Sequence, residues 1–456
     1  MSLKKSTKYK FKNDLLSYES FINEFTPEHF KEYNLKAEKL KLKSKIEELI
    51  HGKEVNETEN QAAWHPKYRK NTAKNSSNQF SIIKSRVYDL INKYKNSHSK
   101  STTVPRINII TIGIGGSYEG PKLLAESLNE PLRNNGFNLK FISGSDPIEF
   151  VHTTKQLNPE ETIFIISSKS FTTQETIETM KLAMQWSSDI NKFIAITANN
   201  NEAKKYNFND KNIITFDKEI GGRYSIWTCV AEATTFSFVK EKEKSEPFLS
   251  FSKGGYASDK DILNNEEYFE FLKFLSFSDI WLHNSKGKNI RAVLSYIWLF
   301  RSLPNYIQQL EMESLGKPAY TESEFHKTGQ IIFGGYGPRA QHSYFQLLHQ
   351  GTHQVCADII ASRENQKNLA YAQALTQSKL LSQGSRKLKK VEKINGNVPT
   401  NLFILNKVDS YSLGYLISSW EHRTFITAKM LGINPFDQFG VNAGKIYTKK
   451  YLADKN

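Results

Sequence analysis

A short apolar run, followed at once by glycines and then by a helical pattern, constrains this chain more than any other feature. Residues 107–112 (INIITI) are apolar and β-branched, and the turn at residues 113–117 (GIGGS) leads into a helix-forming stretch at 121–128. The same plan recurs at residues 163–167 (IFIIS), where a Ser/Thr-rich turn leads to a helical stretch that ends near Trp186. Strands that alternate with helices predict βαβ units and a parallel sheet.

The rest of the chain extends this pattern to a second α/β unit. Further strand candidates are the apolar runs 193–198, 213–216, 331–333 and 402–405. Helices are predicted over residues 12–50, over 290–303, and through Ile82, Val87, Leu90 and Ile91. A charged, low-complexity linker at residues 239–247 separates the two units. We expect a helical N-terminal segment (1–100) that packs on the larger domain, a first domain (101–245), and a second domain (246–456) that ends in a C-terminal helix.

Composition excludes several classes of protein. The 456 residues are 38% hydrophobic and 24% charged, as in folded globular chains, so the protein is not largely disordered. Apolar runs fall short of the roughly 18 residues that span a bilayer, and the polar N-terminus resembles neither a signal peptide nor a transit peptide. Only two cysteines occur, so we expect neither a disulfide framework nor a cysteine zinc site. A cytoplasmic enzyme or binding protein is the expectation, without membrane association.

The net charge of +15 raises the question of nucleic acid. Residues 61–100 hold nine Lys/Arg and one acid in an Asn/Ser/Lys-rich stretch, which accounts for much of the excess. No zinc-finger spacing, RNA-binding aromatic motif or heptad run accompanies it. A solvated basic surface is therefore favoured over a polyanion site, and it would also attract small phosphorylated anions.

The turn Gly113–Ser117 lies between a predicted strand and a predicted helix. Glycines let the backbone approach an anion, and a helix N-terminus supplies N–H donors. A tight turn without a ligand is the alternative. A dinucleotide site fits poorly, because Ser117 and Tyr118 shift the third glycine of that fingerprint to Gly120.

The turn of residues 168–173 (SKSFTT) offers four hydroxyls and the ammonium group of Lys169 at the equivalent point of the next strand. Hydroxyl donors, a cation and a helix N-terminus suit a phosphate dianion. The alternative is a helix-capping cluster, for which one or two hydroxyls suffice. Both turns are predicted at the carboxyl edge of one parallel sheet, where open α/β folds bind ligands.

Two further segments carry charged groups that could act in a reaction. Gly221 and Gly222 precede Arg223 and permit an unusual backbone that displays the guanidinium into a cleft, although a surface arginine is the simpler reading. Glu311 and Glu313 stand among apolar residues, where the pKa of a carboxyl group rises and the group can act as a base; a surface glutamate is the alternative.

Three histidines, His342, His349 and His353, fall within twelve residues. A metal cluster is disfavoured because they lack the HExxH spacing and accompanying cysteines. Structural histidines or a catalytic acid/base remain. Lys445 follows a glycine at a predicted helix start and could reach a substrate or be solvated.

Taken in order, these segments resemble the glucose-6-phosphate isomerase (phosphoglucose isomerase) family. Its pattern runs GIGGS, SKTFTTxET, GGRYS, QxxMESxGK, QHxFYQLxHQGT and DQxGVxxGK, and all six segments occur here between Gly113 and Lys445. Departures are Ser170 for Thr, Leu315 for Asn, Ala340 for Gly, and Asn442-Ala443 for Glu-Leu. None removes a group that would carry a proton or hold phosphate.

The resemblance implies two sugar-isomerase (SIS) type α/β domains with parallel-rich sheets, plus a helical N-terminal segment and a C-terminal extension. It also implies equilibration of D-glucose 6-phosphate and D-fructose 6-phosphate, in glycolysis and gluconeogenesis, with no cofactor and no metal. By resemblance, the sugar phosphate is held by Gly116, Ser117, Ser168, Lys169, Ser170 and Thr173.

The resemblance also assigns the catalytic groups. Glu313 would be the base that moves a proton between C2 and C1 through a cis-enediol, and Arg223 would stabilise the enediolate. His342 would open the sugar ring, with Lys445 at the ring oxygen and Glu175 supporting the histidine. Gln309 would orient substrate hydroxyls.

A homodimer is implied, because in the family a second subunit contributes the histidine-bearing loop. Two alternatives are a dual phosphoglucose/phosphomannose isomerase, which we expect to be shorter, and a SIS-type sensor that binds sugar phosphate without reaction. A sensor would not need Glu313, His342 and Lys445 together.

Overall fold

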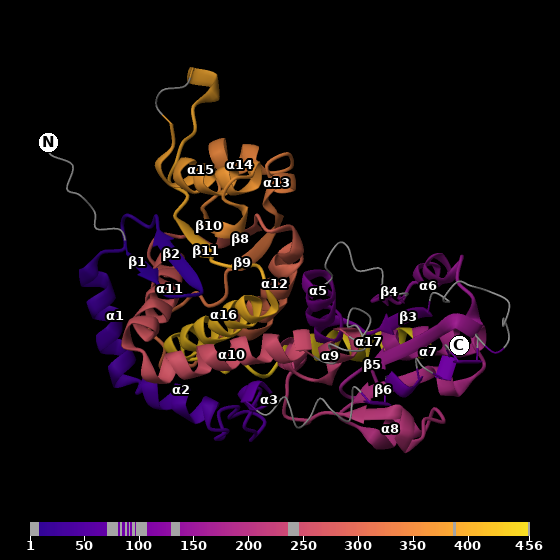
Figure 1. Ribbon diagram of the computed structural model, residues 1–456. Coiled ribbons are helices and arrows are strands. Elements are labelled where there is room, and N and C mark those ends of the chain that lie inside the picture. Colours follow the sequence, from indigo (N-terminus) through magenta and orange to yellow (C-terminus); the bar gives the residue numbers. More distant parts are fainter. Residues whose placement is uncertain are drawn as a thin grey trace, which may run out of the picture.

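Two β-sheets, each flanked by helices, form the framework of the computed structural model (Figure 1). The structure describes residues 9–70, 81–82, 84–86, 89–90, 92–93, 96, 107–128, 137–235, 246–385 and 389–454. One sheet has five parallel strands in the order β4-β3-β5-β6-β7; the other has six in the order β1-β2-β11-β10-β8-β9. This arrangement confirms the predicted α/β fold with two parallel-rich sheets.

The five-stranded sheet has a centre of short strands, β3, β5 and β6, that are buried on both faces, while the edge strand β4 is half-buried. Its strands are β3 (Ile107–Ile112), β4 (Phe137–Ile142), β5 (Thr162–Ser167), β6 (Phe193–Thr197) and β7 (Ile213–Thr215). Its helices are α5 (Glu119–Leu128), α6 (Pro147–Thr154), α7 (Gln174–Trp186), α8 (Asn200–Lys204) and α9 (Cys229–Thr235). Ile109 of β3 packs in one hydrophobic core and Ile110 in another, because alternate side chains point to opposite faces.

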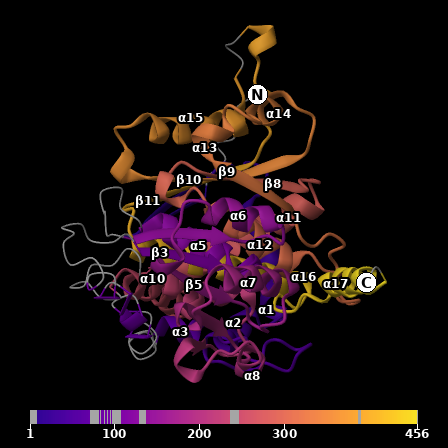
Figure 2. The ribbon, with the colours of Figure 1, turned by 90° about the vertical axis from the view of Figure 1, so that its right-hand side faces the viewer.

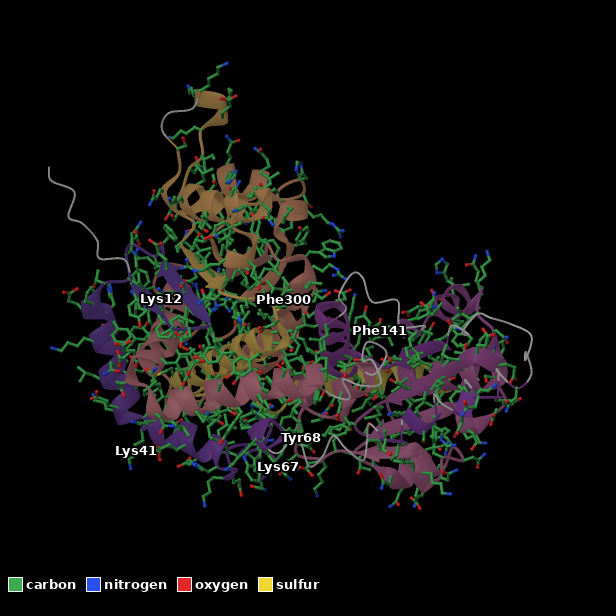
Figure 3. The ribbon with its side chains drawn as sticks, viewed as in Figure 1. Lys12, Lys41, Lys67, Tyr68, Phe141 and Phe300 are labelled. Atoms are coloured by element: carbon green, nitrogen blue, oxygen red, sulfur yellow. The ribbon has the colours of Figure 1, made fainter. Side chains whose placement is uncertain are left out.

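The six-stranded sheet contains β8 (Ile290–Ser295), β9 (Ile331–Tyr336), β10 (Val355–Ser362) and β11 (Thr400–Leu405), which are parallel to one another. Helices α13 (Gly337–Ala340), α14 (Phe345–Gln350) and α15 (Leu369–Gln383) lie over one face. Helices α10 (Glu246–Asn264), α11 (Glu266–Asn284), α12 (Leu303–Leu315) and α16 (Ser410–Leu431) lie over the other (Figure 1). Phe300, just before α12, is buried in a core that also contains Ile109 and so connects the two units (Figure 3).

The strand predictions at 107–112, 163–167, 193–198, 213–216, 331–333 and 402–405 are confirmed within a residue or two at most boundaries. Strands β4 and β10 were not predicted. The predicted helix over 290–303 is wrong. Residues 290–295 form β8, which pairs with β9 and β10 and is buried on both faces, so its sequence lacks the alternation that distinguishes a half-exposed strand from a buried helix.

The predicted helices over residues 12–50 are only partly correct. Residues 10–20 form a hairpin of β1 (Lys10–Lys12) and β2 (Leu16–Ser20), and β2 extends the second sheet antiparallel to β11. Leu16, Tyr18 and Ser20 are buried and the residues between them are not, which is the alternation of a strand. The helices α1 (Pro27–Lys39), α2 (Leu42–Ile50) and α3 (Pro66–Lys70) follow.

Several predicted features fall largely outside the described residues. They include the basic stretch within 61–100, parts of the helix through Ile82 and Leu90, and most of the linker at 239–247. The domain boundaries near residues 100 and 245 therefore stay a prediction. In the described part of the chain, no helix combines the length and the apolar character needed to cross a membrane.

The C-terminal helix α17 (Asn442–Ala453) extends away from the rest of the chain (Figure 2). All of its residues are exposed, including the large apolar side chains of Ile446, Tyr447 and Tyr451. The predicted C-terminal helix is confirmed. Its exposure means that the segment before it, rather than its own packing within this chain, determines its direction.

Candidate active site

Helix α12 carries two of the predicted site residues on one side. Gln309 and Glu313 are one turn apart, and Gln309 Nε2 donates to Glu313 Oε1 at 3.4 Å. The Glu313 side chain is 32% exposed and so can be reached from outside. Gln309 Oε1 is buried and finds no hydrogen-bond partner among the described residues. An acceptor of this kind is suited to a hydroxyl of a bound molecule.

The guanidinium of Arg223 contacts the Glu313 carboxylate. Arg223 lies in a 3₁₀ segment (Gly222–Trp227), and its Nη1 is 3.1 Å from Glu313 Oε2. Arg223 is only 1% exposed. Its other N–H groups donate to Ser314 Oγ, to Gln438 Oε1, and to the backbone carbonyls of Pro435 and Asp437. The cation is therefore held rigidly beside the carboxylate, and the alternative of a surface arginine is wrong because the side chain is buried.

The GIGGS turn lies directly against the segment that carries Arg223. A Cβ atom on Gly116 would stand 2.0 Å from the carbonyl oxygen of Gly222, so glycine is required at this close approach. Ser225 Oγ donates to the carbonyl oxygen of Gly116 at 3.3 Å. Gly115, with φ of +59°, faces Gln309, whose Nε2 would be 3.1 Å from an added Cβ. The glycine turn thus meets both Arg223's segment and α12.

The hydroxyl-rich turn between β5 and α7 adjoins the glycine turn. Ser167 Oγ donates to Ser117 Oγ at 3.1 Å, which joins the two turns at the carboxyl edge of the sheet, as predicted. Ser168 Oγ donates to Thr173 Oγ1 at 3.2 Å and accepts from the N–H of Phe171. Phe171 has a φ of +54° and is fully buried, so the turn has a fixed, sharp shape.

These hydroxyls do not serve as ordinary helix caps. Thr173 is the N-cap residue of α7, yet in the described chain its side chain makes no capping bond. Ser170 Oγ instead accepts from the N–H and the hydroxyl of Thr172 in an exposed turn. The first N–H groups of α7 remain available to an anion. This favours the phosphate-site interpretation over the capping one.

Lys169 is half-buried in this turn. Its carbonyl oxygen accepts from Thr197 Oγ1 and from the N–H of Ala198, both at 3.0 Å, which holds the turn against β6. Burial lowers the pKa of the Lys169 ammonium group; the Glu59 charge opposes this shift and the Arg223 charge adds to it. An anion bound here would restore that pKa.

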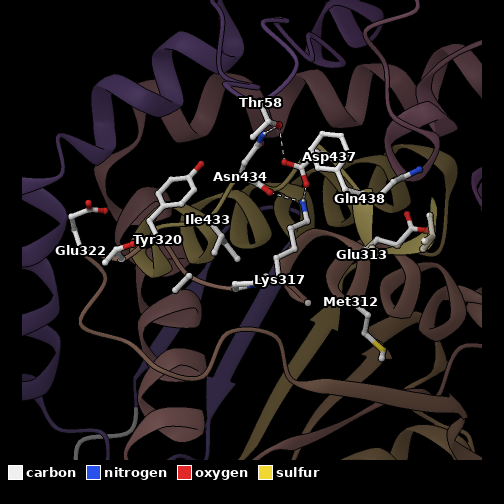
Figure 4. Close-up of a pocket in the computed structure, with 17 residues that line it drawn as sticks. Thr58, Met312, Glu313, Lys317, Tyr320, Glu322, Ile433, Asn434, Asp437 and Gln438 are labelled. Carbon is white, nitrogen blue, oxygen red and sulfur yellow. Dashed lines mark hydrogen bonds and ion pairs between the residues drawn. The ribbon is translucent and has the colours of Figure 1, made fainter. Parts of the chain in front are cut away.

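A cavity of about 720 Å³ is lined in part by the Glu313 side chain (Figure 4). Its polar lining includes Lys317 and Gln438, and its wall continues along Phe439, Gly440 and Val441 toward α17. Burial and the Arg223 charge lower the pKa of Lys317 to about 8, although Asp437 and Glu313 oppose the shift. A cavity of this size accommodates a small sugar, but among the described residues that line it Glu313 is the one predicted site residue, and the lining includes neither Arg223 nor the two turns.

Three predicted residues are not brought to this group within the described chain. His342 is exposed just after α13 and does not line the cavity. Lys445 is exposed on α17, and no contact between Glu175 and His342 is recorded among the described residues. The roles predicted for His342, Lys445 and Glu175 therefore stay predictions.

The neighbouring histidines have separate environments. His349 is half-buried and its Nε2 pairs with Gln377 Oε1 at 2.9 Å, which indicates a structural histidine. His353 is exposed. In the parts of the chain that the structure describes, no three His, Cys, Asp or Glu side chains are grouped so as to hold a metal ion.

Sequence reasoning missed Gln438, Lys317 and Ser314 as parts of the site. All three lie inside segments that match the family's motifs, so membership of a motif was the signal that could have identified them. Their contacts with Arg223 or Asp437 join segments more than 80 residues apart, which spacing alone does not reveal.

The fold is shared with solved sugar-phosphate isomerases. A glucose-6-phosphate isomerase from Chlamydia trachomatis superposes with a TM-score of 0.80 over 98% of this chain and 90% of its own, at 23% identity. A tagatose-6-phosphate ketose/aldose isomerase from Escherichia coli superposes with a TM-score of 0.51 over 82% of this chain and 95% of its own, at 13% identity. At these identities the likeness concerns the fold, and it supports the predicted SIS-type arrangement.

Sequence comparison is more specific. A protein named glucose-6-phosphate isomerase from Wigglesworthia glossinidia brevipalpis is 33% identical over 97% of this chain and 86% of its own length. Another, glucose-6-phosphate isomerase 1 from Neisseria meningitidis, is 30% identical over 90% of this chain and 82% of its own. The family model for phosphoglucose isomerase matches residues 20–456. Because this match covers most of the chain and relatives of 30% identity or more span it as well, the chain belongs to the phosphoglucose isomerase family.

Proposed function

We propose that this protein is an isomerase that interconverts D-glucose 6-phosphate and D-fructose 6-phosphate, an early step of glycolysis that also serves gluconeogenesis. The observation that carries the proposal is the carboxylate of Glu313 held 3.1 Å from the buried, fully engaged guanidinium of Arg223. A base beside a fixed cation is what proton abstraction next to a carbonyl group requires. Family membership and the names of the relatives support the choice of substrate.

In the proposed reaction the phosphate binds to the two turns at the sheet edge. Gly116 and Ser117 belong to the first turn, and Ser168, Lys169, Ser170 and Thr173 belong to the second. The hydrogen bond from Ser167 to Ser117 and the uncapped start of α7 support a single anion site there. These groups contact a part of the sugar that does not react, so they mainly set affinity.

Glu313 then removes the proton from C2 of the open-chain aldose, which leaves negative charge on the C1 oxygen as an enediolate, and this oxygen takes a proton from solvent. The product of this step is a cis-enediol. The same carboxyl group returns its proton to C1 while the C2 hydroxyl gives its proton to solvent and becomes the ketone oxygen. Arg223 stabilises the negative charge on the enediolate oxygens, and the free carbonyl oxygen of Gln309 receives a substrate hydroxyl.

Ring opening is assigned to His342, with Lys445 near the ring oxygen and Glu175 supporting the histidine. We propose that His342 reaches the site of a second copy in a homodimer with shared active sites. In a single chain His342 is exposed, and so is the whole of α17 with its large apolar side chains; both observations support this assignment. A C2 dimer would complete two equivalent sites at once.

A cytoplasmic location is also proposed. Cys229 and Cys356 are both buried, unpaired thiols, which suits a reducing compartment.

The isomerase proposal is tested by a coupled assay that follows conversion of fructose 6-phosphate, with and without a chelator. We expect conversion that the chelator does not change. No conversion by folded protein would refute the proposed activity, and loss with chelator would refute the metal-free mechanism.

Shared sites are tested by mixing inactive Glu313→Gln and His342→Ala chains. If each site takes one residue from each subunit, random reassociation restores about one quarter of the sites. Mixed dimers with no regained activity would show that both residues act from the same chain.

A further inference from the structure

Asp437 lies at the centre of contacts that the reaction above does not use. Its carboxylate accepts from Thr58 Oγ1 at 2.7 Å through Oδ2 and pairs with Lys317 Nζ at 3.1 Å through Oδ1. Lys317 Nζ also donates to the backbone carbonyl of Asn434. Figure 4 shows Lys317 and Thr58 approaching Asp437 from opposite sides.

The three groups come from distant parts of the chain. Thr58 belongs to the N-terminal segment, Lys317 follows the end of α12, and Asp437 lies in the connection from α16 to α17. Lys317 is only four residues beyond Glu313. The ion pair therefore ties the helix that carries the base to the segment that leads to α17.

Two cationic side chains bind the segment of residues 434–441. Lys317 holds the carbonyl of Asn434 and the carboxylate of Asp437, while Arg223 holds the carbonyls of Pro435 and Asp437 and the side chain of Gln438. Beyond Val441 every residue of α17 is exposed. Within the described chain, the path of residues 434–441 is what sets the direction of α17 and hence of Lys445.

We propose that Lys317, Asp437 and Thr58 are positioning residues that set Gln438 and the start of α17 relative to Glu313. None of the three needs to contact the reacting carbons. Their effect passes through Gln438, which bonds to Arg223, and through the orientation of Lys445. The expected effect on kcat rests on the proposed isomerase function. The expected effect on the conformation of residues 434–441 does not depend on that function.

The protonation state of Lys317 gives the inference a readout in pH. Lys317 faces Asp437 from the 434–441 segment, Arg223 from the 3₁₀ segment and Glu313 from α12, while Tyr320 and Glu322 line the same cavity. Burial, with the Arg223 charge, lowers the Lys317 pKa to about 8, so its proton is lost at mildly alkaline pH. Arginine at this position would stay charged throughout that range.

The test compares Lys317→Met, Lys317→Arg and Asp437→Asn with the natural chain. We expect Lys317→Met to lower kcat about tenfold or more with little change in KM, because misplacement of about 1 Å can cost 10²-fold in rate. Lys317→Arg should keep most of kcat and move the alkaline limb of the pH profile upward by about one pH unit or more. Lys205→Met, which removes an exposed lysine paired with Glu202, is the matched control and should change nothing.

Hydrogen exchange separates this inference from the proposed activity. Peptides that cover residues 434–441 should exchange about tenfold faster in Lys317→Met and Asp437→Asn, and at the natural rate in Lys205→Met. Unchanged exchange in both variants, or natural kcat and pH profile in Lys317→Met, would overturn the inference. If the natural chain does not isomerise at all, the proposed function fails while the exchange result still decides the positioning role. Should Lys317→Met not fold, the near-isosteric Asp437→Asn carries the same comparison.

Discussion

Glu311 and Glu313 are two acids on one helix that we expect to respond in opposite ways to the same substitution. Glu313 is partly exposed and paired with Arg223 at the cavity. Glu311 is 5% exposed, bonds to Trp420 Nε1 at 2.6 Å and pairs with Arg291 in the core. Changing each in turn to glutamine removes one charge and keeps the shape, so the pair forms its own control.

Glu313→Gln should abolish most activity and leave the fold intact. The base contributes about 10²–10⁴-fold to proton transfer, so kcat should fall by at least about 10². Arg223 keeps its other acceptors, and a partly exposed ion pair contributes at most about 1 kcal/mol. The KM for fructose 6-phosphate should change little.

Glu311→Gln should have the converse effect. Breaking a buried ion pair by removing one partner costs about 3–5 kcal/mol, because the other charge loses compensation. Arg291 still pairs with Asp279 and Asp358 in the variant, and burial raises the pKa of Glu311 and so disfavours its charged form; the cost should therefore fall below that range without vanishing. Where the variant is folded, kcat should stay within about tenfold of the natural value, since Glu311 points away from the cavity into the core.

The measurements are kcat from the coupled assay and the free energy of unfolding from urea titration. The reasoning fails if Glu313→Gln keeps more than about a tenth of kcat, a loss below the base contribution. It also fails if Glu311→Gln unfolds at the same urea concentration as the natural chain.

Three further predictions concern phosphate, ring opening and pH. Ser168→Ala combined with Thr173→Ala should raise KM far more than it lowers kcat, because each hydrogen bond to a charged group contributes about 1.5–3 kcal/mol to binding; an unchanged KM would remove this turn from the site. His342→Ala should lose about 10²-fold on the cyclic sugar and much less on an open-chain analogue; equal losses on both would place His342 in the proton transfer or in folding. Glu232 is buried, and within the described chain its Oε1 has no hydrogen-bond partner. Burial raises the pKa of its carboxyl group to about 8. Between about pH 4.5 and pH 8 the folded chain keeps a proton on Glu232 that the unfolded chain has lost, so the free energy of unfolding falls as pH rises through this window. Glu232→Gln should therefore gain stability over the natural chain across that window by a few kcal/mol, as seen in unfolding curves at pH 5 and pH 8; a constant difference between the two pH values would contradict it.

Four of the five strands of the first sheet, all but β4, and the two turns at its carboxyl edge could be predicted from residues alone. Runs such as 107–112 and 163–167 are short, β-branched and bounded by glycine or hydroxyl residues, so local pattern and tertiary role agree. The helix prediction for residues 290–295 was wrong because a strand buried on both faces has no polar–apolar alternation that would distinguish it from a buried helix. The hairpin at residues 10–20 was not predicted because β11, the strand with which it pairs, lies almost 400 residues away in sequence.

The site was predictable in part for a similar reason. The hydroxyl turn is local, and its chemistry can be read from six consecutive residues. The contact between Arg223 and Glu313 joins segments 90 residues apart, and only the resemblance brought them together before the structure did. His342 and Lys445 remain predictions, since their proposed partners belong to a second copy or to α17, which this chain alone leaves exposed.

The most direct test of the central claim is to follow the conversion of fructose 6-phosphate in D₂O by NMR. Proton transfer through an enediol on a single carboxyl group allows exchange with solvent, so the account predicts glucose 6-phosphate with deuterium at C2 in at least a fraction of the product. Glu313→Gln should give neither conversion nor deuterium. Full conversion by the natural protein with no deuterium at C2 would indicate direct hydride transfer, and it would contradict the role proposed for Glu313.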